Sequence, residues 1–195
     1  MELFAAQMDE HRQELIRLDT AIGDGDHGTN MNRGMQKALE KLHAADQADP
    51  GAVLKTVAMA LISSVGGAAG PLYGTLFLQL GGALAGHADV DLPTYAAAWR
   101  KAVEGVQARG KAQAGDKTMV DSLLPAVEAL EQASDLDTGL RAAANAAEQG
   151  MLATVPLVAR RGRASYLGER SAGHQDPGST STYYLFESAY EAFTS

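Results

Sequence analysis

The sequence predicts an all-α protein in which eight helices pack antiparallel in a bundle. Its 195 residues can bury one core without splitting, so residues 1–195 are expected to form a single domain. Small residues that let helices approach closely are abundant, with 21 glycines and many alanines, whereas aromatic residues make up only 6% of the chain. The alternation of Val, Ile, Thr and Tyr that is typical of strands is nearly absent, which argues against a sheet.

Glycines, aspartates and prolines delimit the helices. An Asp- and Gly-rich segment, 19–26, separates the first two helices, and the Gly-rich segment 66–70 separates the third from the fourth. Asp49-Pro50, Leu92-Pro93 and Asp176-Pro177 lie at or just before the first turns of the third, fifth and eighth helices, where the missing proline N–H is tolerated. In chain order, the helices are expected at residues 3–18, 27–44, 51–65, 71–85, 93–108, 118–133, 136–158 and 179–193.

The loops between these helices fall into two groups. Short connections between antiparallel helices place odd-numbered loops at one end of a bundle and even-numbered loops at the other. The even-numbered loops have the composition of solvated turns: 45–50, 86–91 and 134–135. The odd-numbered loops contain every unusual motif: 19–26, 66–70, 110–117 and 160–178. The sequence therefore predicts a functional site at one end of the bundle.

Composition excludes several other classes of protein. The formal net charge of −8 argues against a nucleic-acid partner, which clustered Lys and Arg would bind. No cysteine is present, so disulfides and thiolate metal sites are ruled out. The first acidic residues come too early for a signal peptide, and a cytoplasmic location is expected. The uncharged stretch 56–86 is long enough to span a bilayer, but its glycine break divides it into two segments of core-helix length, so no membrane contact is expected.

The segment between the first two helices suits a hard metal ion. It carries Asp19, Asp24 and Asp26, with glycines that let the backbone fold around a cation. A turn at Gly25 is expected to bring the carboxylates of Asp24 and Asp26 together. An EF-hand does not fit, since Ala and Gly occupy positions that need oxygen donors and Asn stands where that motif has a bidentate Glu. Mg²⁺ shared with substrate phosphates is the better match, and a plain Asp- and Gly-rich turn is the alternative.

The other odd-numbered loops offer candidate phosphate contacts. Segment 63–71 places backbone N–H groups beside a helix N-terminus, which indicates either an anion site or close packing of small residues. Segment 110–118 nearly matches a P-loop, but Asp116 precedes Lys117 and the segment follows a helix, so only a nucleotide contact stays open. Segment 160–178 concentrates arginine, which suits a polyphosphate facing the aspartates, although an exposed basic turn has the same composition.

The sequence pattern does not indicate that His27 or His174 acts as a nucleophile or as a metal ligand. His27 is expected at the N-terminus of the second helix, and His174 is expected to form a hydrogen bond within the last loop. Neither lies with a Ser or Cys in an arrangement that indicates covalent catalysis, so no catalytic nucleophile or base is expected in this chain.

Together these segments resemble the nucleotide-binding L subunits of dihydroxyacetone kinases along nearly the whole chain. The similarity is carried by four blocks in order: 22–34, 63–71, 115–119 and 162–178. The resemblance implies an eight-helix antiparallel up-and-down barrel with the nucleotide at one end. It also implies two Mg²⁺ ions on Asp19, Asp24 and Asp26. By the same similarity, the ADP or ATP contacts fall on His27, Gly28, Thr29, Asn30, Ala68, Ala69, Gly110, Met119, Arg163, Asp176, Pro177 and Gly178. Ala69 stands where the family often has Ser, so a hydroxyl contact is missing there.

The activity that the resemblance implies is phosphoryl transfer by positioning and charge neutralisation. In the family, dihydroxyacetone is held on a histidine of a separate K subunit, which must dock against the nucleotide end. A stand-alone chain of this length favours ADP as a retained cofactor, recharged by a phosphohistidine protein of the phosphotransferase system. The alternatives are an ATP-dependent kinase subunit, a regulatory subunit that binds a transcriptional activator, and a purely structural helical bundle.

Overall fold

The computed structural model describes residues 1–44 and 49–194, and the regular elements in these ranges are all helical. Part of the expected loop 45–50 therefore lies outside the described residues. In chain order the elements are α1 (Glu2–Glu10), α2 (Arg12–Ile22), α3 (His27–His43), α4 (Pro50–Ser64), α5 (Ala69–Ala83), α6 (Leu92–Gly110), α7 (Val120–Gln132), α8 (Leu136–Ala153), the 3₁₀ helix η1 (Arg163–Ser171) and α9 (Pro177–Thr194).

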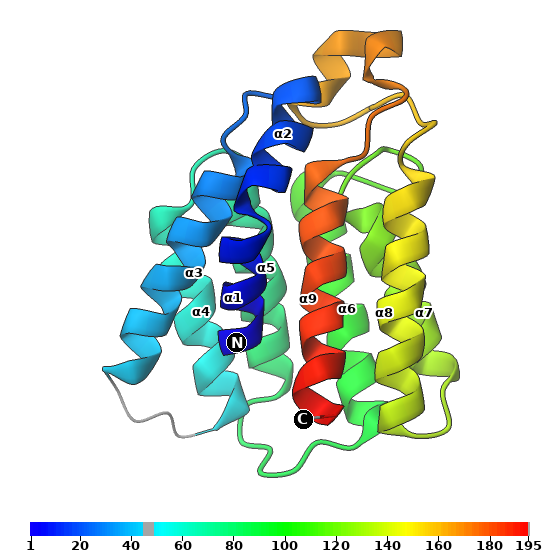
Figure 1. Ribbon diagram of the computed structural model, residues 1–195. Coiled ribbons are helices and arrows are strands. Elements are labelled where there is room, and N and C mark those ends of the chain that lie inside the picture. Colours follow the sequence, from blue (N-terminus) through cyan, green and yellow to red (C-terminus); the bar gives the residue numbers. More distant parts are fainter. Residues whose placement is uncertain (45–48, 195) are drawn as a thin grey trace.

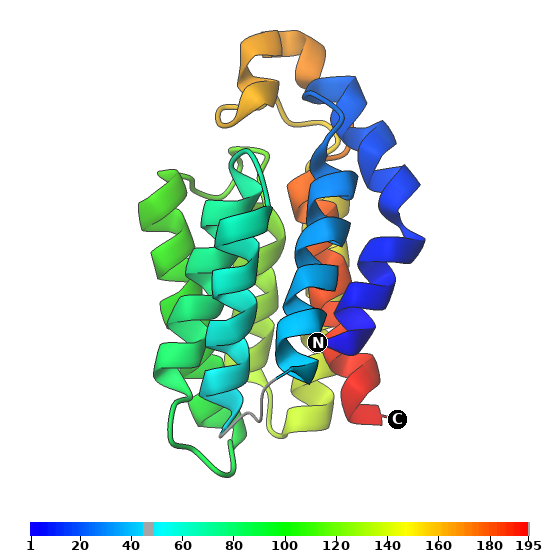
Figure 2. The ribbon, with the colours of Figure 1, turned by 90° about the vertical axis from the view of Figure 1, so that its left-hand side faces the viewer.

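The helices close into an up-and-down barrel (Figure 1). From α3 to α9, each α-helix packs against the next one along the chain, α9 returns to pack against α1, and α1 packs against α3. The view from the side shows that α1 and α2 together occupy the position of one helix of the barrel (Figure 2). Within the described residues, the predicted architecture of eight antiparallel helices is confirmed, with α1 and α2 counted as one. None of the helices in the described ranges combines the length and apolar composition that crossing a bilayer requires.

Two of the expected helices differ from the observed ones by more than two residues at an end. The helix expected at 3–18 is broken at His11, whose ring stacks on Tyr184 at a centroid distance of 4.2 Å and whose Nδ1 lies 3.1 Å from Glu14 Oε2. Helix α2 then continues to Ile22, so Asp19 lies within its last turn rather than ending it. The helix expected at 136–158 ends at Ala153, because a proline two residues after Thr154 disfavours helical backbone before it.

The two ends of the barrel begin their helices differently. At the far end, the side chains of Asp49, Asp91 and Asp135 accept hydrogen bonds from backbone N–H groups of α4, α6 and α8, at 2.8, 3.0 and 2.9 Å. These are ordinary N-caps in solvated turns. At the other end, the N-cap residues of α3, α5 and α7 provide no side-chain cap. The His27 N–H at the start of α3 donates to Asp19 and the Val120 N–H at the start of α7 donates to Thr118, whereas the start of α5 leaves N–H groups available to a ligand.

Candidate functional site

A pocket at the second end of the barrel gathers residues from all four odd-numbered loops, as their composition predicted. The 3₁₀ helix η1 extends over this end of the barrel (Figure 1), and its residues Arg163 and Ala164 line the pocket. The predicted site residues that line this pocket are Asp19, Asp24, Asp26, His27, Asn30, Ala68, Ala69, Met119, Arg163, Asp176, Pro177 and Gly178. The structure thus brings together segments that lie more than 150 residues apart in the chain.

The remaining three predicted residues lie elsewhere. Gly110 lines a neighbouring apolar pocket that shares Ala68, Leu72 and Met119 with the first one. Neither pocket is lined by Gly28 or Thr29. Gly28 is buried against α2, since a Cβ there would lie 2.2 Å from the backbone oxygen of Arg12. Thr29 is exposed on α3, one turn from the aspartates.

The three aspartates form one cluster. One carboxylate oxygen from each of Asp19, Asp24 and Asp26 lies within 4.8 Å of the other two. Asp19 is only 9% exposed, and its Oδ2 accepts hydrogen bonds from the backbone N–H groups of Asp26, at 2.8 Å, and His27, at 3.1 Å. These bonds attach the end of α2 to the start of α3. The expected turn is present, because Gly25 has a φ of 74°, in the left-handed region.

This cluster has the donor chemistry of a site for a hard cation. All three donors are carboxylate oxygens, the ligands preferred by Mg²⁺ and Ca²⁺. Three carboxylates this close repel one another unless positive charge is nearby. Arg163 supplies part of that charge, since its Nη2 lies 2.9 Å from Asp24 Oδ2. The side chain of Arg163 is nevertheless 64% exposed, so it can also face a ligand in the pocket.

Asp176 also lines the pocket. Its carboxylate is buried and accepts a hydrogen bond from the backbone N–H of Ser179 at 2.6 Å, which caps the start of α9. Its own N–H donates to Thr154 Oγ1 at 3.0 Å. Burial raises the pKa of Asp176 to about 7, and the negative charges of Asp121 and Asp19 add to this effect, while the Ser179 bond and Lys117 oppose it.

Asp176 should make the ligand-free protein less stable as the pH rises. The unfolded chain ionises this group near its ordinary pKa of 3.8, whereas the folded protein holds the proton up to about pH 7. The contribution of protonated Asp176 to the free energy of unfolding is therefore fully present below about pH 4 and is lost as the pH rises to about 7. Asp176→Asn should stabilise the protein more at pH 8 than at pH 5, by a few kcal/mol at most, since one pKa unit corresponds to about 1.4 kcal/mol. Urea denaturation of the variant and the wild-type protein at both pH values measures the change in unfolding free energy. An equal change at pH 5 and at pH 8 would contradict the prediction.

A buried hydrogen-bond relay supports the floor of the pocket. His27 Nε2 lies 2.9 Å from Ser181 Oγ, which lies 2.7 Å from the Tyr73 hydroxyl, and that hydroxyl lies 3.1 Å from Thr182 Oγ1. The relay joins the starts of α3, α5 and α9. Burial lowers the pKa of His27 and raises that of Tyr73 to about 12, so both side chains are neutral at pH 7. Sequence reasoning missed it; the Ser/Thr run 179–182 in an otherwise apolar helix was the available signal.

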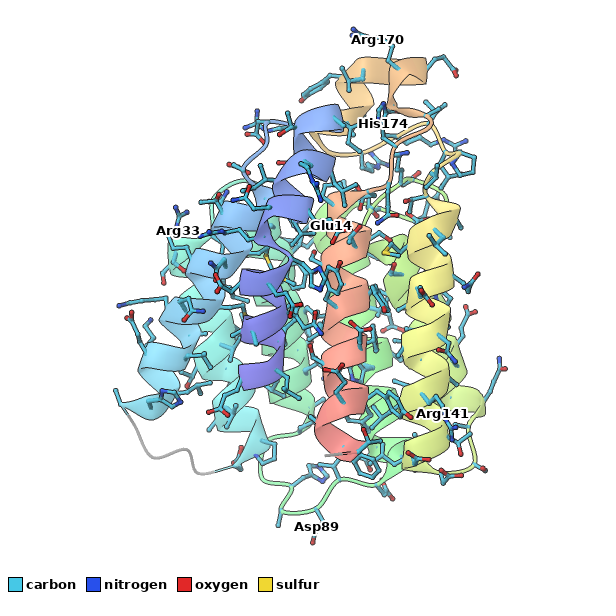
Figure 3. All side chains as sticks on the ribbon, viewed as in Figure 1. Glu14, Arg33, Asp89, Arg141, Arg170 and His174 are labelled. Atoms are coloured by element: carbon cyan, nitrogen blue, oxygen red, sulfur yellow. The ribbon has the colours of Figure 1, made fainter. Side chains whose placement is uncertain are left out.

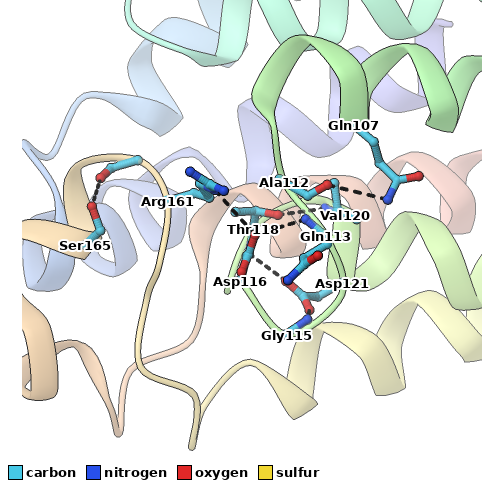
Figure 4. A network of polar contacts seen from close by, with 11 residues as sticks. Gln107, Ala112, Gln113, Gly115, Asp116, Thr118, Val120, Asp121, Arg161 and Ser165 are labelled. Carbon is cyan, nitrogen blue, oxygen red and sulfur yellow. Dashed lines mark hydrogen bonds and ion pairs between the residues drawn. The ribbon is translucent and has the colours of Figure 1, made fainter.

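The segment that resembles a P-loop is instead a compact turn held by carboxylates (Figure 4). Asp121 accepts hydrogen bonds from the N–H groups of Gly115 and Thr118, at 2.6 and 2.7 Å. Asp116 accepts one from the N–H of Gln113 at 3.0 Å, and its Oδ2 lies 3.5 Å from Arg161 Nε. The turn presents Thr118 and Met119 to the pocket. A nucleotide contact in this segment stays a prediction, now placed on these two residues.

The fold and the site together define the class of protein, which is an all-helical barrel with an acidic, arginine-bearing pocket at one end. The family model that matches residues 21–191 is described as the DAK2 domain, and the chain belongs to this family. This confirms the resemblance drawn from the motifs.

Two curated relatives and one solved structure are similar over most of the chain. The chain is 48% identical over 177 residues to the PEP-dependent dihydroxyacetone kinase, ADP-binding subunit DhaL of Escherichia coli (strain K12), covering 89% of this chain and 84% of that one. It is 42% identical over 188 residues to the PTS-dependent dihydroxyacetone kinase, ADP-binding subunit DhaL of Lactococcus lactis subsp. lactis (strain IL1403), covering 96% and 92%. The crystal structure of the dihydroxyacetone kinase of C. freundii superposes with a TM-score of 0.77 at 25% identity. That match covers 98% of this chain and 33% of the other, so this chain corresponds to about a third of that kinase.

Proposed function

We propose that residues 1–195 form the nucleotide-bearing subunit of a dihydroxyacetone kinase, with ADP as a retained cofactor. The subunit would pass a phosphoryl group to dihydroxyacetone held on a separate K subunit, after recharging by a phosphohistidine protein of the phosphotransferase system. The names of the two curated relatives, which are PEP- or PTS-dependent and ADP-binding, support this version over the ATP-dependent one.

The observation that carries the proposal is the composition of the pocket. Three carboxylates within 4.8 Å of one another suit Mg²⁺, Arg163 contacts one of them, and the start of α5, which has no side-chain cap, lines the same space. The adjoining apolar pocket, lined by Leu72, Val106 and Val120 among others, has the character that a purine base requires. An anion with an apolar group attached, bound through a hard cation, fits this combination.

The residues of this chain would act by positioning. Asp19, Asp24 and Asp26 would hold Mg²⁺, with two ions as the expected number, and Mg²⁺ supplies charge neutralisation for phosphoryl transfer when it is bound. Asp19 is already fixed by two backbone N–H groups, so its carboxylate needs little reorganisation on binding. The neutral Tyr73 and His27 relay would keep the starts of α3, α5 and α9 in register beneath the phosphates.

Replacing Arg163 should separate the binding of the cation from that of the nucleotide. Arg163 competes with a cation for Asp24, so Arg163→Ala should leave affinity for Mg²⁺ alone unchanged or raise it. It should weaken Mg-ADP binding by about tenfold, or about 1.4 kcal/mol, the order expected for a charged hydrogen bond to phosphate. Titration calorimetry with each ligand measures both effects. Arg170→Ala is the matched control, since Arg170 lies on η1 and points away from the pocket (Figure 3). Parallel losses for both ligands would contradict the assignment.

Reconstitution tests the proposed activity. Purified chain would be combined with a K subunit and dihydroxyacetone, and supplied either with ATP or with the phosphoenolpyruvate relay of the phosphotransferase system. We expect dihydroxyacetone phosphate only with the relay. Turnover with ATP alone would replace the proposal by the ATP-dependent version, and no product with either donor would leave the regulatory or structural alternatives.

A further inference from the structure

Lys117 is a buried cation that the proposed function does not use. It lies in the turn before α7, is only 1% exposed, and its backbone has a φ of 63°, in the left-handed region. A lysine in that conformation at a buried position requires strong fixation by its surroundings. Lys117 was grouped at the sequence level with a possible nucleotide contact; in the structure its ammonium group points to protein carbonyls instead.

The ammonium group is surrounded by four backbone carbonyl oxygens. Nζ donates to the oxygens of Thr154, Val155 and Leu157, at 2.8, 3.4 and 3.1 Å, and to that of His174. A charged lysine has three N–H donors to share among four acceptors, whereas a neutral amine would offer two and turn its lone pair towards a carbonyl. Burial lowers the pKa of Lys117, while the carboxylates of Asp176 and Asp121 oppose that effect. This carbonyl cage resembles the coordination of a monovalent cation.

The four carbonyls belong to the two ends of one loop. Three of them lie just after the end of α8, at residues 154, 155 and 157, and the fourth lies two residues before Asp176. The backbone N–H of Gly173 also donates to the oxygen of Val155, at 2.8 Å. Lys117 therefore closes the neck of segment 154–176, which carries η1 and Arg163. His174, at the neck, and Arg170, on η1, are labelled in Figure 3.

We propose that Lys117 is a positioning residue whose ammonium group serves as a built-in monovalent cation, holding the neck of segment 154–176 closed. The neck fixes the separation of Arg163 and Asp176 in the pocket lining, because Arg163 lies inside the segment and Asp176 is its last residue. Lys117 borders the pocket, but its ammonium group is directed to the carbonyls of segment 154–176, so it acts through these residues. The inference deepens the proposed function and rests on it for the binding readout, but the environment of Lys117 can be measured without any nucleotide.

The first test is the exchange of the Lys117 ammonium protons in the wild-type protein. Heteronuclear NMR of ¹⁵N-lysine-labelled full-length protein detects NH₃⁺ groups whose protons exchange slowly with water. We expect a protected NH₃⁺ signal that is missing from Lys117→Gly and retained in Lys111→Gly. Lys111 is the matched control because it also has a positive φ, 49°, and is exposed at the end of α6. Exchange as fast as that of surface lysines overturns the proposal, whatever the variants show.

The second test is chemical rescue of Lys117→Gly. Glycine accepts the left-handed backbone and leaves a space lined by carbonyl oxygens. Mg-ADP affinity should fall about 10- to 100-fold, the range for residues that orient a site from behind, and n-butylammonium chloride should restore most of it. Tetramethylammonium chloride, which has no N–H donors, should restore none. Wild-type affinity in folded Lys117→Gly, or no rescue by butylammonium, overturns the proposal.

Two further outcomes are distinguishable. If Lys117→Gly does not fold, the proton-exchange measurement decides alone. If the wild-type protein binds no Mg-ADP, the proposed function fails, while the exchange measurement still judges the carbonyl cage around Lys117.

Discussion

Asp24→Asn should abolish Mg-dependent ADP binding while leaving the helical barrel intact. The substitution keeps the shape of the side chain but removes one of three anionic donors that lie within 4.8 Å of one another. Removing a charge from a close charge cluster typically costs about 2–5 kcal/mol, so the affinity should fall by about 30-fold or more. Phosphoryl transfer should fall with it. Calorimetric titration of ADP in the presence and absence of Mg²⁺ measures the effect.

The control for this variant lies at the far end of the barrel. Asp89 is an exposed aspartate in the loop between α5 and α6, at the opposite end from Arg170 in Figure 3. Asp89→Asn makes the same chemical change and the same change in net charge, and it should leave ADP binding as in the wild type. Circular dichroism should show unchanged helical content in both variants. Wild-type affinity in Asp24→Asn would remove the metal assignment.

Gly28→Ala should destabilise the protein and weaken the site at the same time. A Cβ at this position would lie 2.2 Å from Arg12 O and 3.0 Å from Ile16 N. Both atoms belong to the backbone of α2, so relief requires the helix to move away from α3. Overpacking of this kind costs about 1–3 kcal/mol. Because α2 carries Asp19, the same movement should also weaken Mg-ADP binding.

Gly82→Ala is the matched control for steric fit. Gly82 lies near the end of α5, and a Cβ there would meet no atom within 4 Å. The substitution should stabilise the protein by about 0.5 kcal/mol, because alanine has the better helix propensity. Urea denaturation of both variants gives the comparison. Equal effects of the two substitutions would contradict the close α2–α3 contact.

The part of the site that composition could predict is the part encoded by local sequence. Aspartates and glycines at 19–26 indicate a cation-binding turn, and the antiparallel rule predicts that this turn lies at the same end of the bundle as Arg163 and Asp176. Helix starts were equally local, since Asp49 and Asp91 are N-caps followed closely by proline. These features depend on backbone conformation and on the order of short loops.

The features that sequence reasoning missed depend on contacts between distant segments. The break at His11 follows no glycine or proline and coincides with its stacking on Tyr184. In the sequence, Lys117 has the character of a basic loop residue. Its role depends on contacts of its ammonium group with the carbonyls of Thr154, after α8, and His174. Tyr73 reads as a core aromatic residue until Ser181 comes within 2.7 Å of its hydroxyl. The polar partners of Lys117 and Tyr73 lie at least 37 residues away in the chain. Periodicity and local motifs do not encode contacts at that separation.

Denaturation of the purified wild-type protein, followed by chromatography of what it releases, tests the central claim most directly. Protein dialysed in the presence of Mg²⁺ should release roughly stoichiometric ADP, because Mg²⁺ on the aspartate cluster and the neighbouring Arg163 would both hold the phosphates. Dialysis against a chelator should reduce that yield, since the carboxylates then repel the phosphates. A protein that is free of nucleotide after dialysis with Mg²⁺, and that does not take up ADP when Mg²⁺ and ADP are added back, would contradict the account.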